Sequence, residues 1–366
     1  MKLDLKIIND EIYVKCEVIV TKDHYSFALL HTLQATQFKN NDRYVNSICK
    51  EECSMKFQPP MIKYTFQDLQ EGVLSFEYCG ELEGPFLFMQ EELIHMSYYN
   101  GWYPIGYDVI EEYDITVHCD SSYELIHGQF DKEKNVWFYT TRHQTIVDCN
   151  IILINKSQAL SYINEKVHIY YFDENHKEYM QKYFDRYISV YEYYVSLYEN
   201  DKIGFNSIVF LPEKYQFGAY KRDHLIVFSE FEKDLHTLAH EIAHAYASGA
   251  NVNSWEDWLN ETHAEWSALL YEEEHNLSYF EHLLKERYRG YKGNYKLNAL
   301  SDQRPDDVHE TGTLIYYEIY KKYGKDAIKT LLKIFDQLEN KNTDSFLRQL
   351  MIENKRLAEE IQMRLK

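Results

Sequence analysis

The sequence contains no run of apolar residues long enough to cross a membrane. Its 366 residues are 45% apolar, yet no segment reaches the roughly 18 consecutive apolar residues that a spanning helix requires. The first six residues mix apolar with charged side chains, so the start also lacks the apolar stretch of a secretory signal. We therefore expect a cytoplasmic protein with no membrane partner.

A surplus of basic residues is also missing. The chain has 39 Lys and Arg against 59 Asp and Glu, which gives a formal net charge of −20. Nucleic acids and anionic membranes are bound through basic surfaces. The charge balance therefore argues against a nucleic acid as the main partner, and it leaves the oligomeric state open.

The cysteines lack the arrangement of a structural metal site. All six lie in the first half of the chain, and no second pair at ligand spacing accompanies Cys49 and Cys53. Reduced structural thiols are the expectation for a cytoplasmic protein.

The length exceeds what one hydrophobic core usually supports, so we expect two domains, residues 1–165 and 166–366. The first part has short β-prone stretches between polar turns, and these predict an antiparallel β domain. The clearest such stretches are residues 14–20, 113–118 and 136–141.

The second part changes its periodicity and predicts a mixed α and β domain. Strands are expected at residues 167–172, 207–211 and 224–228, a helix over 175–199, and almost only helices from about 232 onward. Asp307 and Glu310 form a candidate capping box and Gly324 a stop signal, which together predict a helix over 308–323. The expected fold class is therefore α+β.

The string Leu238–Tyr246 carries the strongest functional signal. His240 and His244 stand four residues apart, so on a helix they share one face and both reach one cation. Glu241, beside the first histidine, points toward the same space and can contact a metal-bound water. A hydrogen-bonded core pair or a solvated face is the alternative interpretation of these histidines.

A catalytic zinc needs three protein ligands and one open position. Glu261, on the following predicted helix, is the candidate third ligand. Glu265 follows one turn later and is expected to accept a hydrogen bond from a ligand histidine, which would fix its tautomer. A wet helix surface is the alternative for this Glu-rich stretch. His236 is expected to be structural or at the surface, and His263 points to another face.

These residues predict one Zn²⁺ per chain and peptide-bond hydrolysis. The metal lowers the pKa of its bound water and polarises the scissile carbonyl. Glu241 then takes the proton of this water as general base and passes it to the leaving amine.

The motif His-Glu-Ile-Ala-His, followed by Trp-Leu-Asn-Glu-Thr-His-Ala-Glu-Trp, resembles the aminopeptidase N and leukotriene hydrolase family of gluzincins. This resemblance implies an N-terminal antiparallel β domain followed by a thermolysin-like zinc catalytic domain of mixed sheet and helices. Gly218, Ala219 and Tyr220 lie where the family has its substrate strand, so they are implied to bind a peptide substrate.

Several positions depart from the family pattern. The family's amine-binding Glu is absent, and Lys221 and Arg222 follow the substrate strand instead. These cations favour acidic side chains or a C-terminal carboxylate, unless they are only solvated strand ends. Exopeptidase and endopeptidase action therefore both stay open. The family's large C-terminal helical domain has no counterpart here, which implies a more open cleft.

His309 matches the family's proton-donating Tyr. A neutral imidazole can donate to an oxyanion, and a helix N-terminus disfavours its cationic form. A solvated His in a first helical turn is the alternative.

The leading hypothesis is a zinc metallopeptidase of the gluzincin type acting on peptides, including a narrow maturation peptidase. The alternative is a non-catalytic, zinc-stabilised peptide-binding protein on a peptidase fold. No sequence feature supports hydrolysis of a non-peptide such as an epoxide.

Overall fold

The structure is a computed structural model, and it describes residues 1–46, 48–54, 58–106, 112–141, 149–212, 218–228, 235–288, 297 and 304–365. The chain divides into two compact units. The first comprises residues 1–161, 170–172 and 210–218, and the second comprises 162–169, 173–209 and 219–366. The chain passes between the units more than once, so the predicted division at residue 165 stays a prediction.

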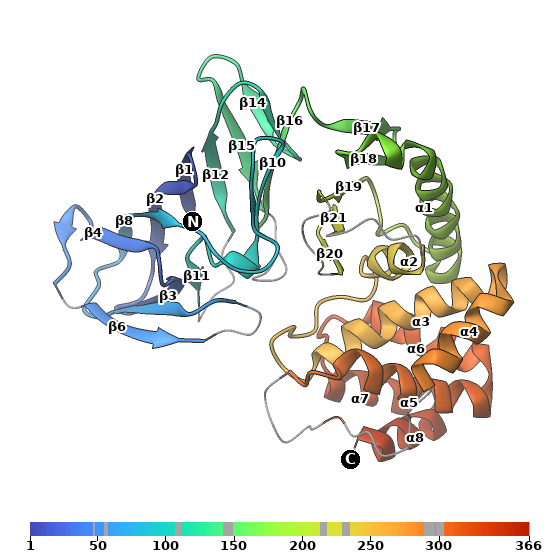
Figure 1. The fold of residues 1–366 in the computed structure, drawn as a ribbon. Coiled ribbons are helices and arrows are strands. Elements are labelled where there is room, and N and C mark those ends of the chain that lie inside the picture. The colour runs from blue at the N-terminus through green and yellow to red at the C-terminus, as the bar shows by residue number, and fades with distance from the viewer. Residues whose placement is uncertain are drawn as a thin grey trace. The chain divides into compact units, whose positions relative to one another are not determined.

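The first unit consists of β-sheets (Figure 1). Its eight-stranded sheet has the order β14 (Gln129–Asp131), β15 (Val136–Thr140), β12 (Asp114–His118), β1 (Lys2–Ile8), β2 (Glu11–Val20), β8 (Gly72–Glu81), β4 (Gln34–Asn40) and β5 (Arg43–Tyr44). One four-stranded sheet has the order β13 (Tyr123–Leu125), β16 (Ile151–Asn155), β10 (Leu93–Met96) and β9 (Phe88–Met89). The other has the order β11 (Ile105–Gly106), β3 (Tyr25–Leu30), β7 (Met61–Phe66) and β6 (Ile48–Cys53). A short 3₁₀ helix spans Tyr98–Asn100.

Alternating side chains build this unit. In β2, every second residue from Ile12 to Val20 is buried and the residues between them face outward, because successive side chains of a strand point to opposite faces. Phe27 stacks on Phe76 with ring centroids 4.6 Å apart in the core between strands. The expectation of purely antiparallel pairing needs one correction, since β1 pairs with β12 in parallel.

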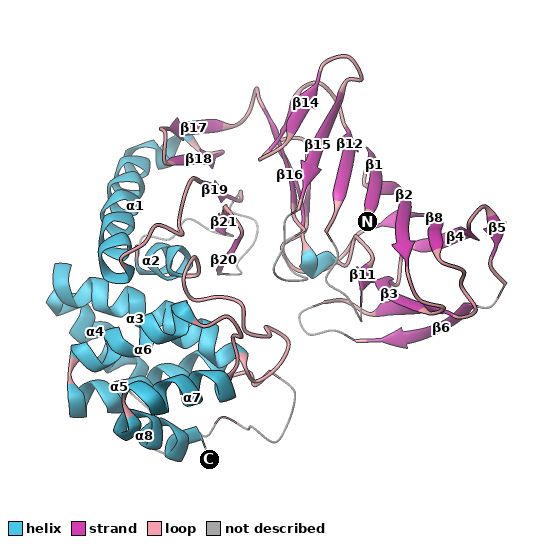
Figure 2. Cartoon of the chain, turned by 180° about the vertical axis from the view of Figure 1, so that it is seen from behind, coloured by secondary structure: helices cyan, strands magenta, loops and turns pink. Residues whose placement is uncertain are grey.

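The second unit combines most of a five-stranded sheet with helices (Figure 2). The sheet has the order β17 (Leu160–Ile163), β18 (Val167–Tyr171), β19 (Asn206–Phe210), β21 (Leu225–Phe228) and β20 (Ala219–Arg222). The helices are α1 (Lys177–Tyr198), α2 (His236–Ala243), α3 (Asp257–His275), α4 (Leu277–Tyr288), α5 (Val308–Tyr323), α6 (Lys325–Gln337), α7 (Thr343–Glu353) and α8 (Lys355–Leu365). A 3₁₀ turn, Glu174–His176, precedes α1.

Helix α2 lies between the sheet and the helical bundle. It packs against the edge strand β20 on one side and against α3 on the other, and α3 packs in turn against α5. These contacts bring the ends of α2, α3 and α5 together. No helix within the described ranges is both long and apolar enough to cross a membrane.

The observed elements give an α+β fold and agree with the sequence pattern in most places. The predicted helix over 308–323 is α5, and Gly324 follows it with φ 78°. The predicted capping box is wrong. Asp307 occupies the N-cap position, but its side chain makes no cap hydrogen bond and Oδ2 accepts from the Thr311 hydroxyl at 3.1 Å. Parts of the predicted helical region, residues 232–234, 289–296 and 298–303, lie outside the described residues.

Candidate metal centre

Three helices of the second unit supply the predicted site residues. His240 and Glu241 belong to α2, and His244 directly follows its last residue with helical backbone angles (φ −60°, ψ −10°). Glu261 and Glu265 stand one turn apart on α3. His309 lies in the first turn of α5. The fold thus assembles in one place residues that are up to 69 positions apart in the sequence.

The carboxylate of Glu261 is surrounded by three imidazole rings. Its Oε2 lies 3.3 Å from His240 Nε2, 3.8 Å from His244 Nε2 and 3.1 Å from His309 Nδ1. The rings of His240 and His244 have centroids 5.0 Å apart. The side chains of Glu261, His240 and His244 are 14%, 12% and 15% exposed, so the cluster is largely shielded from water.

The other ring nitrogens fix the tautomers of His240 and His244. Nδ1 of His240 lies 2.9 Å from Glu265 Oε2, and Nδ1 of His244 lies 2.9 Å from the carbonyl oxygen of Ala247. Because a carboxylate and a carbonyl only accept, Nδ1 donates in both rings. In the neutral ring, the lone pair is then on Nε2, which faces Glu261.

This donor set fits a divalent cation. Glu261 Oε2 and Glu241 Oε2 are buried and make no hydrogen bond, although a buried polar atom without a partner is costly. Two imidazole lone pairs and one carboxylate oxygen are the protein ligands of His₂Glu zinc sites, with a fourth position open. His240, His244 and Glu261 could therefore hold Zn²⁺.

By distance alone, either His244 or His309 can be the third metal ligand beside His240 and Glu261. The ligand atoms of His240, Glu261 and His309 all lie within 4.8 Å of one another. His309 is therefore close enough to act either as a ligand or as a donor to a bound substrate.

Burial shifts the pKa values of the site. Burial raises the pKa of Glu241 to about 7, with His240 opposing this shift and Glu261 adding to it. Burial lowers the pKa of His244 to about 4. For His240, burial acts downward, but the neighbouring carboxylates of Glu261 and Glu265 outweigh it and raise its pKa to about 10.

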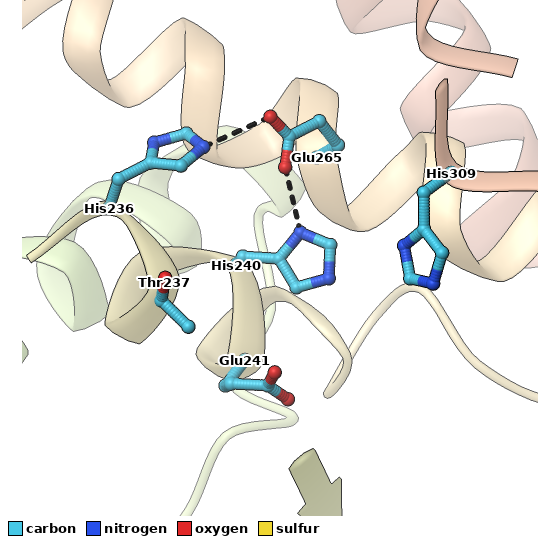
Figure 3. A pocket seen from close by; sticks show the side chains of 6 residues that line it. All are labelled: His236, Thr237, His240, Glu241, Glu265 and His309. Carbon is cyan, nitrogen blue, oxygen red and sulfur yellow. Dashed lines mark hydrogen bonds and ion pairs between the residues drawn. The ribbon is translucent and has the colours of Figure 1, made fainter. Parts of the chain in front are cut away.

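A cavity of about 180 Å³ opens beside these residues (Figure 3). It is lined by His236, Thr237, His240, Glu241, Glu265 and His309. Figure 3 shows the Glu265 carboxylate between two rings: it meets His240 through Oε2 and His236 Nε2 through Oε1 at 3.0 Å. His236 is thus buried behind the site and supports Glu265, as expected of a structural residue.

A glycine allows α5 to approach α3 closely enough to place His309. A Cβ added at Gly312 would lie 1.7 Å from Thr262 Oγ1 and 3.5 Å from the Trp258 ring. Gly312 is one turn after His309, and Thr262 directly follows Glu261. The close crossing of the two helices therefore sets the distance between His309 and Glu261.

The predicted substrate strand is the edge strand β20. Ala219 and Tyr220 pair with Phe228 and Val227 of β21, and β21 is its only neighbour in the described sheet. Gly218 precedes it with φ +48°. The side chain of Tyr220 is buried and that of Ala219 is half-buried. The preceding residue of this motif, Phe217, lies outside the described residues.

Two residues around His309 are absent from the sequence-based expectations. Arg304 Nη2 lies 3.1 Å from His309 Nε2, and Arg304 Nε donates to Asp257 Oδ2 at 2.6 Å. Neither residue belongs to a recognisable motif. His263, in contrast, is a buried core residue: its ring stacks on Phe335 at 4.2 Å and accepts from, or donates to, the Tyr316 hydroxyl.

Comparison with known proteins reveals similarity only at the level of structure. No family model and no curated protein matches the sequence. An M1 zinc metallopeptidase from Deinococcus radiodurans matches with a TM-score of 0.67 and 13% identity, over 100% of this chain and 93% of that one. The chain has the fold of an M1 zinc metallopeptidase.

Two further structures support this assignment of the fold. A mutant of the Deinococcus radiodurans enzyme bound to a Tyr-Ser-Ala substrate matches with a TM-score of 0.66 and 13% identity, over the same shares of both chains. Yeast LTA4 hydrolase in complex with bestatin matches with a TM-score of 0.69 and 12% identity, over 98% of this chain and 65% of that one.

Proposed function

We propose that this protein is a zinc-dependent peptidase in which His240, His244 and Glu261 hold one Zn²⁺. The observation that carries this proposal is the position of Glu261 Oε2, which is buried, makes no hydrogen bond and faces the Nε2 atoms of both histidines. The fold shared with M1 zinc metallopeptidases supports it. Residues 166–366 would form the catalytic domain.

A bound Zn²⁺ supplies Lewis-acid chemistry, because it lowers the pKa of a water molecule and polarises a carbonyl group. Glu241 acts as the general base. Its Oε2 makes no hydrogen bond and is therefore available to take a proton from the attacking water. A pKa raised to about 7 by burial suits a base that works near neutral pH and then delivers the proton to the leaving amine.

His309 stabilises the oxyanion of the tetrahedral intermediate. Its Nδ1 faces the site at 3.1 Å from Glu261 Oε2, and a preorganised donor aimed at developing negative charge typically contributes about 3–4 kcal/mol to catalysis. The edge strand β20 accepts the peptide backbone next to α2, through Gly218, Ala219 and Tyr220.

The substrate class extends beyond free amino termini. β20 carries no amine-binding Glu, and the positive charge of Arg222, at its end, acts against the rise in the pKa of Glu241 and adds to the lowering of the pKa of His244 that burial causes. A cation close to the site favours acidic side chains or a terminal carboxylate rather than an amine.

The function is tested by metal analysis and by cleavage profiling of peptide libraries with free and blocked N-termini. Wild type is expected to bind one zinc per chain and to cleave both libraries. Glu241→Gln should keep the zinc and lose cleavage, whereas Glu281→Gln, at an exposed position of α4, should keep both. Undiminished turnover in Glu241→Gln would refute the mechanism.

A non-catalytic zinc-binding protein is the second candidate. The short distances among His240, Glu261 and His309 favour this alternative. If His309 bound the metal in addition to the three proposed ligands, no position would stay open for water or substrate. Bound zinc with no cleavage of a broad peptide pool would support this alternative.

A further inference from the structure

Four side chains form a closed ring between α3 and the start of α5. Asp257 Oδ2 accepts from Arg304 Nε at 2.6 Å, Arg304 Nη2 lies 3.1 Å from His309 Nε2, and His309 Nδ1 lies 3.1 Å from Glu261 Oε2. Asp257 and Glu261 are one helical turn apart on α3, which closes the ring. The two contacts of Arg304 therefore determine whether Nδ1 of His309 presents an N–H or a lone pair to the site.

A guanidinium group has donors and no acceptor. The contact from Arg304 Nη2 is consequently a hydrogen bond only if His309 Nε2 accepts it. A neutral imidazole carries one proton, so this proton must be on Nδ1, which points toward Glu261. The ring then offers an N–H to the site and keeps its lone pair for Arg304.

The opposite arrangement is found at the two other histidines. Nδ1 of His240 meets the Glu265 carboxylate, and Nδ1 of His244 meets the Ala247 carbonyl oxygen. Both of these partners accept a hydrogen bond, so each ring in its neutral form turns its lone pair toward Glu261. The hydrogen-bond partner of the other ring nitrogen therefore decides what each histidine can do. His240 and His244 can bind a metal, whereas His309 can only donate a proton.

We propose that Arg304 is a positioning residue that makes His309 a proton donor and prevents it from becoming a fourth metal ligand. Binding of a metal through Nδ1 would move the His309 proton to Nε2 and direct it at the guanidinium group. The open position of the metal is thereby kept for water and substrate. The inference rests on the proposed peptidase function, because an open position matters only for catalysis.

Asp257 holds Arg304 in this orientation. The side chains of Arg304 and Asp257 are 8% and 3% exposed, so the ion pair is buried. Asp257 also accepts from Asn260 Nδ2 at 2.8 Å, and Asn260 is bound in turn to the backbone of Ala250. The His309 side chain, in contrast, is 44% exposed. The buried polar network around Asp257, rather than His309, therefore fixes the guanidinium group.

The contact with Arg304 opposes a second proton on His309. Burial lowers the pKa of His309, but the neighbouring Glu261 carboxylate outweighs it and raises the pKa overall, and the positive charge of Arg304 acts against this rise. A doubly protonated ring would face Arg304 with two donors 3.1 Å apart. The neutral ring with its proton on Nδ1 accepts from Arg304 and turns its N–H toward Glu261.

The tautomer can be measured in the metal-free protein by ¹⁵N–¹H correlation spectra of histidine-labelled samples. The His309 signals are assigned by their loss in His309→Gln. Wild type is expected to carry the proton on Nδ1 of His309. A His309 ring protonated on Nε2 would overturn the inference, whether or not the protein cleaves peptides.

The double variant Arg304→Met/Asp257→Asn removes the guanidinium group without stranding a buried charge. We expect that the proton of His309 is no longer confined to Nδ1 in this variant. Arg348→Met, at an exposed position of α7, is the matched control and should keep the wild-type spectrum. A proton that stays on Nδ1 in the folded double variant would contradict the role of Arg304. If the double variant does not fold, the wild-type tautomer still decides the first half of the inference.

Kinetics of the zinc-loaded enzyme distinguish a positioning role of Arg304 from a general effect on the stability of the protein. The double variant should lower kcat by about 10²–10³-fold, as expected for the loss of one oxyanion donor, and should change KM little. Adding His309→Ala to it should cause no further loss, because both changes remove the same donor. Additive losses would contradict the coupling. Absence of cleavage by wild type would instead refute the proposed function and leave the tautomer measurement valid.

Discussion

Gly312 of α5 meets Thr262 of α3 at a distance that excludes any side chain: a Cβ at Gly312 would lie 1.7 Å from Thr262 Oγ1 and 3.1 Å from Thr262 Cβ. Thr262 is buried directly after Glu261, and Gly312 follows His309 by one turn. The contact between these two residues therefore controls the approach of His309, the proposed proton donor, to Glu261, the proposed metal ligand.

Gly312→Ala is expected to push the two helices apart. Overpacking of this kind costs about 1–3 kcal/mol of the free energy of unfolding, and the displaced His309 should lower kcat more than KM. Thr262→Ala removes Oγ1 and should partly restore both quantities in the double variant. Urea unfolding and steady-state kinetics of the two single variants and the double variant test this. Additive effects of the two substitutions would contradict it.

Zinc binding should release a proton at neutral pH. Contacts with Glu261 and Glu265 outweigh burial and raise the pKa of His240 to about 10 in the metal-free protein, so the ring is protonated there and must lose this proton to become a ligand. Calorimetry of zinc binding in buffers with different ionisation enthalpies measures the number released. We expect about one proton per zinc near pH 8, and a loss of zinc affinity as the pH falls.

Glu265→Gln is the matched variant for this measurement. It removes the carboxylate that helps to raise the pKa of His240. Proton release should decrease, and zinc affinity should fall by about 10–100-fold, as is usual when the partner of a ligand histidine is removed. Unchanged proton release in Glu265→Gln would contradict the assigned role of this contact.

Peptide cleavage should depend on the ionisation of Glu241. Burial raises its pKa to about 7, and the general base must be deprotonated to act. The value of kcat/KM should therefore rise with pH and level off near pH 7, or below it where a bound cation stabilises the carboxylate. A pH profile of the zinc-loaded enzyme tests this. An activity that falls steadily as the pH increases from 5 to 7 would be incompatible with Glu241 as the base.

The first unit should lose stability in mild acid because of His95. Its ring is fully buried and contacts the carbonyl oxygen of Phe86 through Nδ1, and burial lowers its pKa from 6.5 to about 4. The unfolded chain therefore binds the proton first as the pH falls. This contribution to stability is complete above pH 6.5 and is lost down to about pH 4, with a total of up to about 3 kcal/mol.

Unfolding experiments between pH 7 and pH 4 measure this loss. In His95→Asn, the amide nitrogen replaces Nδ1 as a donor without titrating, so the pH dependence of unfolding should become weaker. His24→Asn changes an exposed histidine of the same unit and should leave that dependence as in wild type. An identical pH dependence in wild type and His95→Asn would contradict the prediction.

The sequence predicted those parts of the site that depend on local geometry. His240, Glu241 and His244 follow from helical periodicity alone, because residues four apart share a face. The end of α5 follows from Gly324, whereas its start at Val308 was predicted from a capping box that the structure does not contain. Glu261 required more, since its position depends on how α3 packs against α2. The need for a third ligand made it the candidate on the following helix, and the resemblance to a known family supported it.

The contacts that the sequence did not predict connect residues far apart in the chain. Arg304 reaches Asp257 across 47 positions, and His236 reaches Glu265 across 29. No periodic pattern in the sequence predicts such a pairing, because it arises from tertiary packing. The parallel pairing of β1 with β12 is of the same kind, as it joins Lys2 to Asp114.

The central claim is tested most directly by the position of the metal itself. Crystals of the wild-type protein grown with one equivalent of zinc would give an anomalous difference map at the zinc absorption edge. We predict one peak at about 2.1 Å from the Nε2 atoms of His240 and His244 and from a carboxylate oxygen of Glu261, with His309 Nδ1 outside bonding distance. A peak bonded to His309 Nδ1, or no peak beside Glu261, would contradict the account.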